Sequence, residues 1–158
     1  MPKTIGVVGL GYVGLTLTAA LAGKGFIVHG SDVSPGVLET LSHGRSHIFE
    51  PGVEEVFAAH IGQGIQVGTE LPPDTVEVAV ISVSTPVDES SRRPNLANLA
   101  AAARSVAARC APGTLVVVRS TVPVGTSRRV VLPELRAAWG DDVKLVMAPE
   151  RKIGRAHV

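Results

Sequence analysis

A glycine-rich turn near the start of the chain constrains the fold more than any other feature. The apolar run Ile5 to Val8 leads into Gly9-x-Gly11-x-x-Gly14, and the residues after it can continue as a helix. A short, valine-rich run bounded by glycines is typical of a buried parallel strand. In such a strand-turn-helix unit the first glycine makes the tight turn, the second lets the backbone approach a pyrophosphate, and the third lets helix and strand pack closely. The sequence therefore predicts a phosphate-binding turn.

The surroundings of this turn predict which dinucleotide it binds. A helical stretch of small and apolar residues is followed by a second expected strand, 26–32, which ends in Asp32. The acid falls about 20 residues beyond the turn, where a carboxylate can accept hydrogen bonds from an adenosine ribose and repels a 2′-phosphate. No arginine occurs in the segment 33–36 that could accommodate that phosphate. We expect NAD rather than NADP; the alternative is that Asp32 only caps the helix that Pro35 helps to start.

Length and composition exclude several classes of protein. A chain of 158 residues with 45% hydrophobic residues is typical of one globular domain. A formal net charge of +1, with 18% charged residues, gives no basic surface for nucleic acid. We expect no signal peptide, no transmembrane span and no membrane partner. The single cysteine excludes an internal disulfide framework and is compatible with the cytoplasm.

The rest of the chain alternates between expected strands and helices. Further strands are expected over 65–67, 76–83, 115–118 and 143–147, and helices over 36–41, 53–60, 96–110 and 126–139. Asn95 is the expected N-cap of its helix, and Pro133 should kink or split the last one. This alternation predicts an α/β fold with a doubly wound parallel sheet of Rossmann type in a single domain.

Ligands of doubly wound sheets bind beyond the carboxyl ends of the strands. Apart from the glycine-rich turn and Asp32, three polar residues follow expected strand ends and should lie at this edge: Thr85, Thr121 and Glu150. Cys110 ends a helix and should lie near the opposite edge, which favours a structural thiol over a catalytic one.

Each of the three polar residues has a structural alternative. Thr85 could bind a cofactor ribose or phosphate, or it could only end a strand before Pro86. Thr121 could position a water or touch the nicotinamide ribose, or its hydroxyl could bond the backbone of a turn. Glu150 could be a general acid or base, or a solvated surface carboxylate. The five histidines lack metal-ligand spacing, so we expect no metal site.

With these residues in view, the chain resembles the N-terminal part of the UDP-glucose/GDP-mannose dehydrogenase family. The segments that carry the resemblance are Gly9 to Gly14, Asp32, His47 to Gly52, Val83 to Pro86, Ser120 to Gly125 and Pro149 to Arg151. The resemblance implies that Tyr12, Val13, Asp32, Thr85 and Thr121 contact NAD, that Thr121 and Glu150 also help to position water or handle protons, and that Arg151 approaches a nucleotide sugar.

The resemblance also implies a reaction. Family members oxidise the C6 alcohol of a nucleotide sugar to a carboxylate in two hydride transfers, with two NAD and a thiohemiacetal and thioester on a cysteine. The Ile-Phe-Glu-Pro loop and the Pro-Glu-Arg segment are most similar to the branch that oxidises UDP-N-acetylmannosamine or a related UDP-N-acetylhexosamine. The family's catalytic cysteine, lysine and asparagine follow in a later part of the family's sequence, beyond the segment that matches this chain. We therefore expect an inactive fragment of a homo-oligomeric enzyme.

Alternatives to this interpretation remain. They are a stand-alone dinucleotide-binding module, a member of the UDP-glucose or GDP-mannose branch, and a β-hydroxyacid dehydrogenase, although the last leaves the segments after Ser120 and Pro149 unexplained.

The last residues depart from the family pattern. Ile153 to Val158 can be encoded by ATC-GGA-AGA-GCA-CAC-GTC, which is similar to a common sequencing-library adapter. We therefore expect an NAD-binding domain over 1–151 and a non-native tail over 152–158. Other codons in the underlying DNA would contradict this hypothesis.

Overall fold

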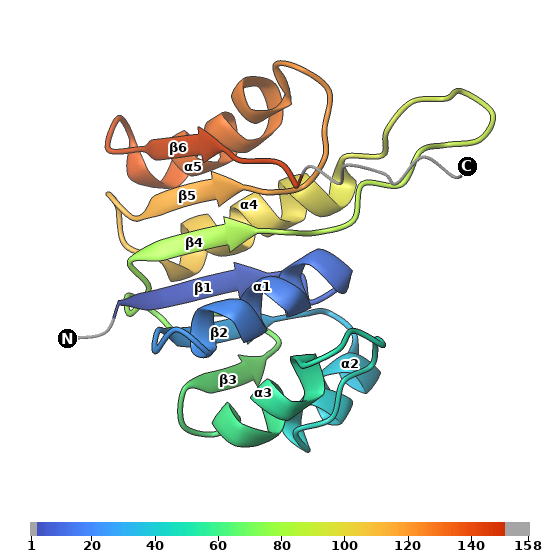
Figure 1. Ribbon diagram of the computed structural model, residues 1–158. Coiled ribbons are helices and arrows are strands. Elements are labelled where there is room, and N and C mark those ends of the chain that lie inside the picture. Colours follow the sequence, from blue (N-terminus) through green and yellow to red (C-terminus); the bar gives the residue numbers. More distant parts are fainter. Residues whose placement is uncertain (1–2, 151–158) are drawn as a thin grey trace.

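The structure is a computed structural model that describes residues 3–150. Six parallel strands form one sheet in the order β3-β2-β1-β4-β5-β6, with helices on both faces (Figure 1). The strands are β1 (Thr4–Val8), β2 (Ile27–Ser31), β3 (Ile65–Gly68), β4 (Val78–Ile81), β5 (Leu115–Val118) and β6 (Lys144–Met147). Strand order reverses between β1 and β4, which pair in parallel from Ile5↔Val78 to Val8↔Ile81. The predicted doubly wound parallel sheet is confirmed.

Alternation along the strands divides the core between the two faces of the sheet. Ile5 and Val7 of β1 pack into one apolar cluster, whereas Val8 packs into the other. The first cluster is covered by α1 (Tyr12–Ala22), α2 (Pro35–Ser42) and α3 (Val53–His60), and the second by α4 (Ala97–Arg109), a π-helical turn η1 (Ser127–Val131) and α5 (Leu132–Trp139). Helices on both faces of the sheet explain why the inner strands β4 and β5 are continuous apolar runs, VAVI and LVVV.

The last helix is split, as Pro133 predicts. Pro133 lies in the first turn of α5, and the preceding turn η1 has π-helical geometry, with the N–H of Leu132 bonded to the carbonyl of Ser127. Proline has no N–H to donate to a helical ladder, so the regular pattern cannot run through this position.

Two local expectations need correction. The strand expected over 76–83 is shorter, because only Val78–Ile81 pairs regularly with both neighbours. Leu96, rather than Asn95, is the boundary residue of α4. Asn95 still contributes to the helix start, because its Oδ1 accepts a hydrogen bond from the N–H of Ala97 at 3.0 Å.

Candidate functional site

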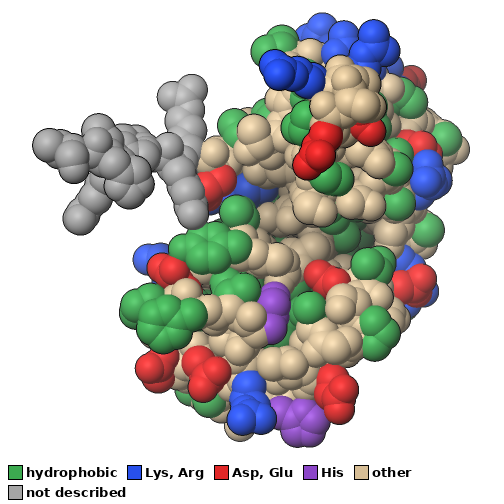
Figure 2. Space-filling view, turned by 90° about the vertical axis from the view of Figure 1, so that its right-hand side faces the viewer, with side chains coloured by type: hydrophobic (Ala, Val, Ile, Leu, Met, Phe, Trp, Pro, Cys, Tyr) green, Lys and Arg blue, Asp and Glu red, His purple; other side chains and the backbone are tan. Residues whose placement is uncertain are grey.

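A pocket of about 310 Å³ opens at the carboxyl edge of the sheet, where strand order reverses. Figure 2 looks onto this edge, and a hollow separates the half of the molecule that carries β1 to β3 from the half that carries β4 to β6. Such a switch point is where doubly wound sheets bind ligands. The pocket is lined by Val8, Gly9, Gly11, Ser31, Asp32, Val33, Thr69, Ser82, Val83, Ser84, Asn98, Ala101, Ala102 and Ser105.

The three glycines of the turn have different surroundings. Gly9 has a φ of +91°, and a Cβ there would meet the carbonyl oxygen of Ser82 at 2.9 Å. A Cβ on Gly14 would lie 1.9 Å from the carbonyl oxygen of Gly9, so helix α1 packs against the turn too closely for any side chain at this position. A Cβ on Gly11 would meet nothing within 4 Å. The space over Gly11 is therefore open toward the pocket, as a cradle for a pyrophosphate requires.

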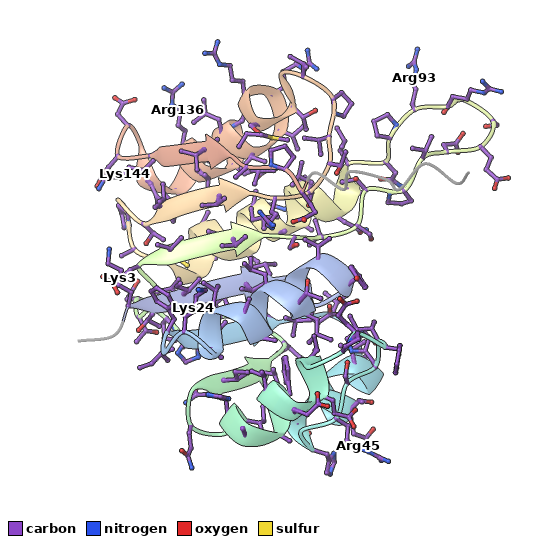
Figure 3. The ribbon with its side chains drawn as sticks, viewed as in Figure 1. Lys3, Lys24, Arg45, Arg93, Arg136 and Lys144 are labelled. Atoms are coloured by element: carbon purple, nitrogen blue, oxygen red, sulfur yellow. The ribbon has the colours of Figure 1, made fainter. Side chains whose placement is uncertain are left out.

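The start of α1 can hold an anion without a basic side chain. Its N-cap is Gly11, and no side chain caps its first turn. Within residues 3–150, no lysine or arginine lines the pocket. Figure 3 shows Lys3, Lys24 and Lys144 at the opposite edge of the sheet. The backbone N–H groups of the first turn and the positive end of the helix dipole are thus the groups that can attract a phosphate here.

Asp32 joins the turn to the neighbouring helix. Its Oδ2 accepts a hydrogen bond from the N–H of Leu10 at 2.8 Å, and its Oδ1 accepts one from the N–H of Ser34 at 2.9 Å. The N-cap of α2 is Ser34, whose hydroxyl accepts from the N–H of Val37. Ser34, rather than Asp32, is therefore the N-cap of this helix, and Asp32 bonds both the glycine-rich turn and the N-cap residue. A carboxylate oxygen can accept more than one hydrogen bond, so both oxygens keep capacity for ribose hydroxyls.

Two hydroxyls connect the ends of β4 and β5 beyond their last paired residues. Thr85 Oγ1 donates to the carbonyl oxygen of Thr121 at 2.8 Å, and Ser120 Oγ donates to that of Val83 at 2.6 Å. A hydroxyl has one proton, so the Thr85 hydroxyl, whose proton goes to Thr121, can only accept from a ligand. A ribose hydroxyl is a suitable partner for it, whereas a phosphate oxygen is not.

Two carboxylates lie near the phenol of Tyr12. Tyr12 donates from its hydroxyl to Glu50 Oε2 at 2.5 Å, which connects the glycine-rich turn to the loop before α3. The pKa of Tyr12 is raised, first by this hydrogen bond, then by partial burial and by the charges of Glu50 and Glu150. Glu150 in turn pairs with Arg119, which directly follows β5. The field of Glu150 thus reaches the glycine-rich turn.

The predicted site residues are therefore divided between the pocket and its surroundings. Gly9, Gly11 and Asp32 line the pocket, whereas Tyr12, Thr85, Thr121 and Glu150 lie at the same edge outside its lining. Val13 and Gly14 belong to the first turn of α1. Arg151 and the segment 152–158 fall outside the described residues.

Sequence reasoning missed a polar group on the α4 side of the pocket. Ser84 and Asn98 line it, and Asn98 Nδ2 donates to both the carbonyl and the hydroxyl oxygen of Ser84 at 3.3 Å. Ser105, further along α4, also lines it. The available signal was that α4 begins at the edge where β4 ends, so its first turns must face the site.

Cys110 lies where its position after a helix predicts. It is buried in the core cluster of the α4 face, and the neighbouring Arg109 carbonyl accepts from the N–H of Asp74 in the loop before β4. Burial, helped by the charge of Asp74, raises the pKa of its thiol to about 11. A thiol that stays protonated and buried is a structural group.

The described residues hold neither a metal cluster nor a membrane helix. Within 3–150 there is no group of three or more His, Cys, Asp or Glu side chains that could hold a metal ion. No helix in the same range is long and apolar enough to cross a membrane.

Comparison with known proteins agrees with this geometry. Residues 3–156 match the NAD binding domain of the UDP-glucose/GDP-mannose dehydrogenase family. The NDP-N-acetyl-D-galactosaminuronic acid dehydrogenase of Ralstonia nicotianae is 37% identical over 129 residues, which are 81% of this chain and 30% of the relative. The UDP-N-acetyl-D-mannosamine dehydrogenase of Campylobacter jejuni is 31% identical over 155 residues, 92% of this chain and 38% of the relative.

A solved structure gives the same result for the fold. The UDP-N-acetyl-mannosamine dehydrogenase Cap5O from Staphylococcus aureus superposes with a TM-score of 0.85 at 30% identity, over 94% of this chain and 37% of that one. The chain thus spans between 30% and 38% of the length of these relatives. The family match covers all of the described residues, 3–150, and specifies NAD as the cofactor. The chain belongs to the UDP-glucose/GDP-mannose dehydrogenase family.

Proposed function

We propose that this chain supplies the NAD-binding part of a nucleotide-sugar 6-dehydrogenase. The observation that carries the proposal is that Gly11 and Asp32 line the same pocket, with open space beside the backbone of Gly11. The first accommodates a pyrophosphate and the second an adenosine ribose, while the residues of the expected chemistry lie further along the same edge. Bound NAD supplies the hydride acceptor.

Each site residue has a role in this proposal. The N–H groups at Gly11, Tyr12, Val13 and Gly14 face the pyrophosphate, and Gly9 makes the turn that presents them. Asp32 accepts from the adenosine ribose. Thr85, whose proton is committed to Thr121, accepts from the nicotinamide ribose.

Thr121 and Glu150 form the chemical end of the site in this proposal. They would hold a water or a proton beside the reacting carbon, since both follow strands that end at this edge. Arg151 would approach the nucleotide sugar. The catalytic thiol that forms the covalent intermediate would come from a further part of the complete protein, because Cys110 is buried at the opposite edge.

The names of the relatives support a substrate class. Two of them are named for N-acetylated hexosamine derivatives carried on a nucleotide. We propose a UDP-N-acetylhexosamine, with UDP-N-acetylmannosamine first among the candidates, oxidised at C6 to the uronate with two NAD. The complete enzyme would work in the cytoplasm as a homo-oligomer.

Two measurements test the proposal. Calorimetric titration of the 158-residue chain should show NAD binding and much weaker NADP binding, with no turnover of nucleotide sugars. The protein encoded by the complete open reading frame should reduce NAD when it is supplied with UDP-N-acetylmannosamine. UDP-glucose and GDP-mannose should be poorer substrates for it. NAD binding without a downstream nucleophile in that reading frame would instead support a stand-alone dinucleotide-binding module. Turnover by the 158-residue chain alone would contradict the fragment interpretation.

A further inference from the structure

Arg119 is the first residue after β5, and its side chain reaches toward the end of β6. Its Nη2 donates to Glu150 Oε2, and its Nη1 donates to the carbonyl oxygen of Ala148 at 3.4 Å. Its own backbone N–H is bonded to the carbonyl of Ile81 in β4 at 2.8 Å. The guanidinium is thus fixed at its base by the sheet and directed at one carboxylate.

This ion pair differs from the others in the described part of the chain. Arg104 and Glu134 pair between α4 and α5, where the arginine side chain is 58% exposed, whereas that of Arg119 is 27% exposed. Arg109, the last residue of α4, pairs at 3.5 Å with Glu70 in the loop after β3, where the side chain of Glu70 is 58% exposed. Arg119 and Glu150, by contrast, follow the ends of β5 and β6 and form a half-buried pair at the carboxyl edge.

The orientation of Arg119 carries a cost. Its Nε is buried and makes no hydrogen bond within residues 3–150. A buried donor without an acceptor is unfavourable, and a turn of the side chain toward solvent would relieve it. The side chain instead keeps both Nη groups on the Ala148 to Glu150 segment. The unfavourable burial of Nε beside a candidate ligand-binding site supports a functional role for this orientation of Arg119.

We propose that Arg119 is a positioning residue for Glu150. The guanidinium binds Oε2 of Glu150, so Oε1 is the oxygen that is left for a water or a proton. A carboxylate held by one oxygen can orient a water or receive a proton with the other without first searching its rotamers. This inference rests on the proposed function, because it assumes that Glu150 handles water or protons in the oxidation.

The test uses the complete dehydrogenase that contains this domain. Arg119→Gln should lower kcat at least about tenfold, because a displaced catalytic group is costly even when binding is intact. The KM for NAD should stay within about twofold, since Arg119 lies outside the pocket lining. Arg119→Lys should recover part of kcat, because it keeps the charge but loses the fork of donors. Arg104→Gln removes the comparable exposed pair and should leave kcat unchanged.

A double-mutant cycle separates positioning from support of the fold. If Arg119 acts through Glu150, Arg119→Gln should have little further effect on kcat in a Glu150→Gln enzyme. Losses that multiply would contradict the proposal. So would a normal kcat in Arg119→Gln alone, or a loss that follows the melting temperature and is not recovered by lysine.

The cycle also distinguishes this inference from the function on which it rests. A fully active Glu150→Gln enzyme would overturn both the role of Glu150 and the positioning role of Arg119, while sugar oxidation itself would still support the family function. A defective Glu150→Gln enzyme beside a normal Arg119→Gln enzyme would overturn the role of Arg119 alone.

Discussion

Asp32 Oδ2 accepts a hydrogen bond from the N–H of Leu10 at 2.8 Å, so the acid at the end of β2 holds the glycine-rich turn that follows β1. Asp32→Ala removes this bond and the one to Ser34. We expect NAD affinity to fall at least about tenfold and discrimination against NADP to weaken, because the ribose acceptor and the repulsion of a 2′-phosphate disappear together. Calorimetric titration with both dinucleotides measures the change.

The same substitution separates binding from folding. Two backbone donors lose their partner, so unfolding by urea should show a loss of about 1–3 kcal/mol. Asp32→Asn keeps an acceptor and should lose less stability. Unchanged affinity for both dinucleotides in Asp32→Ala would place the adenosine elsewhere.

Gly11 and Gly14 should respond oppositely to alanine. A methyl group on Gly14 would collide with the carbonyl of Gly9, so Gly14→Ala should cost more than about 3 kcal/mol or prevent folding. A methyl group on Gly11 meets open space at a φ of −68°, so Gly11→Ala should cost at most about 1 kcal/mol, as an N-cap change, and yet weaken NAD binding strongly. Melting curves and NAD titrations of the two variants check this. A Gly11→Ala protein that binds NAD normally would contradict the prediction that the pyrophosphate lies against the backbone of Gly11.

Tyr12 is the one tyrosine in the sequence, so its ionisation can be followed directly by ultraviolet absorbance. The hydrogen bond to Glu50 stabilises the protonated phenol, and the folded protein should titrate above the ordinary pKa of about 10. This interaction stabilises the fold below that ordinary pKa and is lost as the pH rises through the folded value.

Variants identify the source of the Tyr12 shift. Glu50→Gln should lower the pKa of Tyr12 more than Glu150→Gln does, because the hydrogen bond outweighs the more distant charge. Glu134→Gln, on α5, is the control and should change nothing. Equal effects of the three variants would mean that general surface charge sets the pKa.

Cys110 should be nearly inert toward thiol reagents in the native protein. With a pKa of about 11, only about 0.1% of it is thiolate at pH 8, against about a quarter for an ordinary thiol of pKa about 8.5. Reaction with a chromogenic disulfide should therefore be at least about 100-fold slower in the native protein than in urea. Cys110→Ala should leave NAD binding unchanged. A fast native reaction would show that the thiol is accessible.

The sequence predicted what depends on short-range pattern. The strand that leads into the turn, the edge shared by Asp32, Thr85 and Thr121, and the split at Pro133 all follow from periodicity, glycine spacing and the alternation of strands with helices. Each expresses a local constraint on the backbone, so it is visible in a few neighbouring residues.

Contacts between distant segments could not be predicted in this way. Arg119 is an ordinary charged residue in the sequence, and its pairing with Glu150 exists because β5 and β6 are neighbours. The bonds from Tyr12 to Glu50 and from Asn98 to Ser84 likewise join separate elements. The side-chain rotamers that make such contacts between elements depend on the assembled fold, and they produce no periodic pattern in the sequence.

The position of the pocket has a thermodynamic consequence. Its lining comes from the β1 to β3 half and from the β4 to β6 half of the sheet, and among the six described strands the two halves are joined by the pairing of β1 with β4. A dinucleotide in this pocket would contact both halves of the sheet and hold them together. A ligand that binds only the folded protein raises its apparent melting temperature as the ligand concentration increases. The melting temperature of this domain should therefore depend on the concentration of free cofactor.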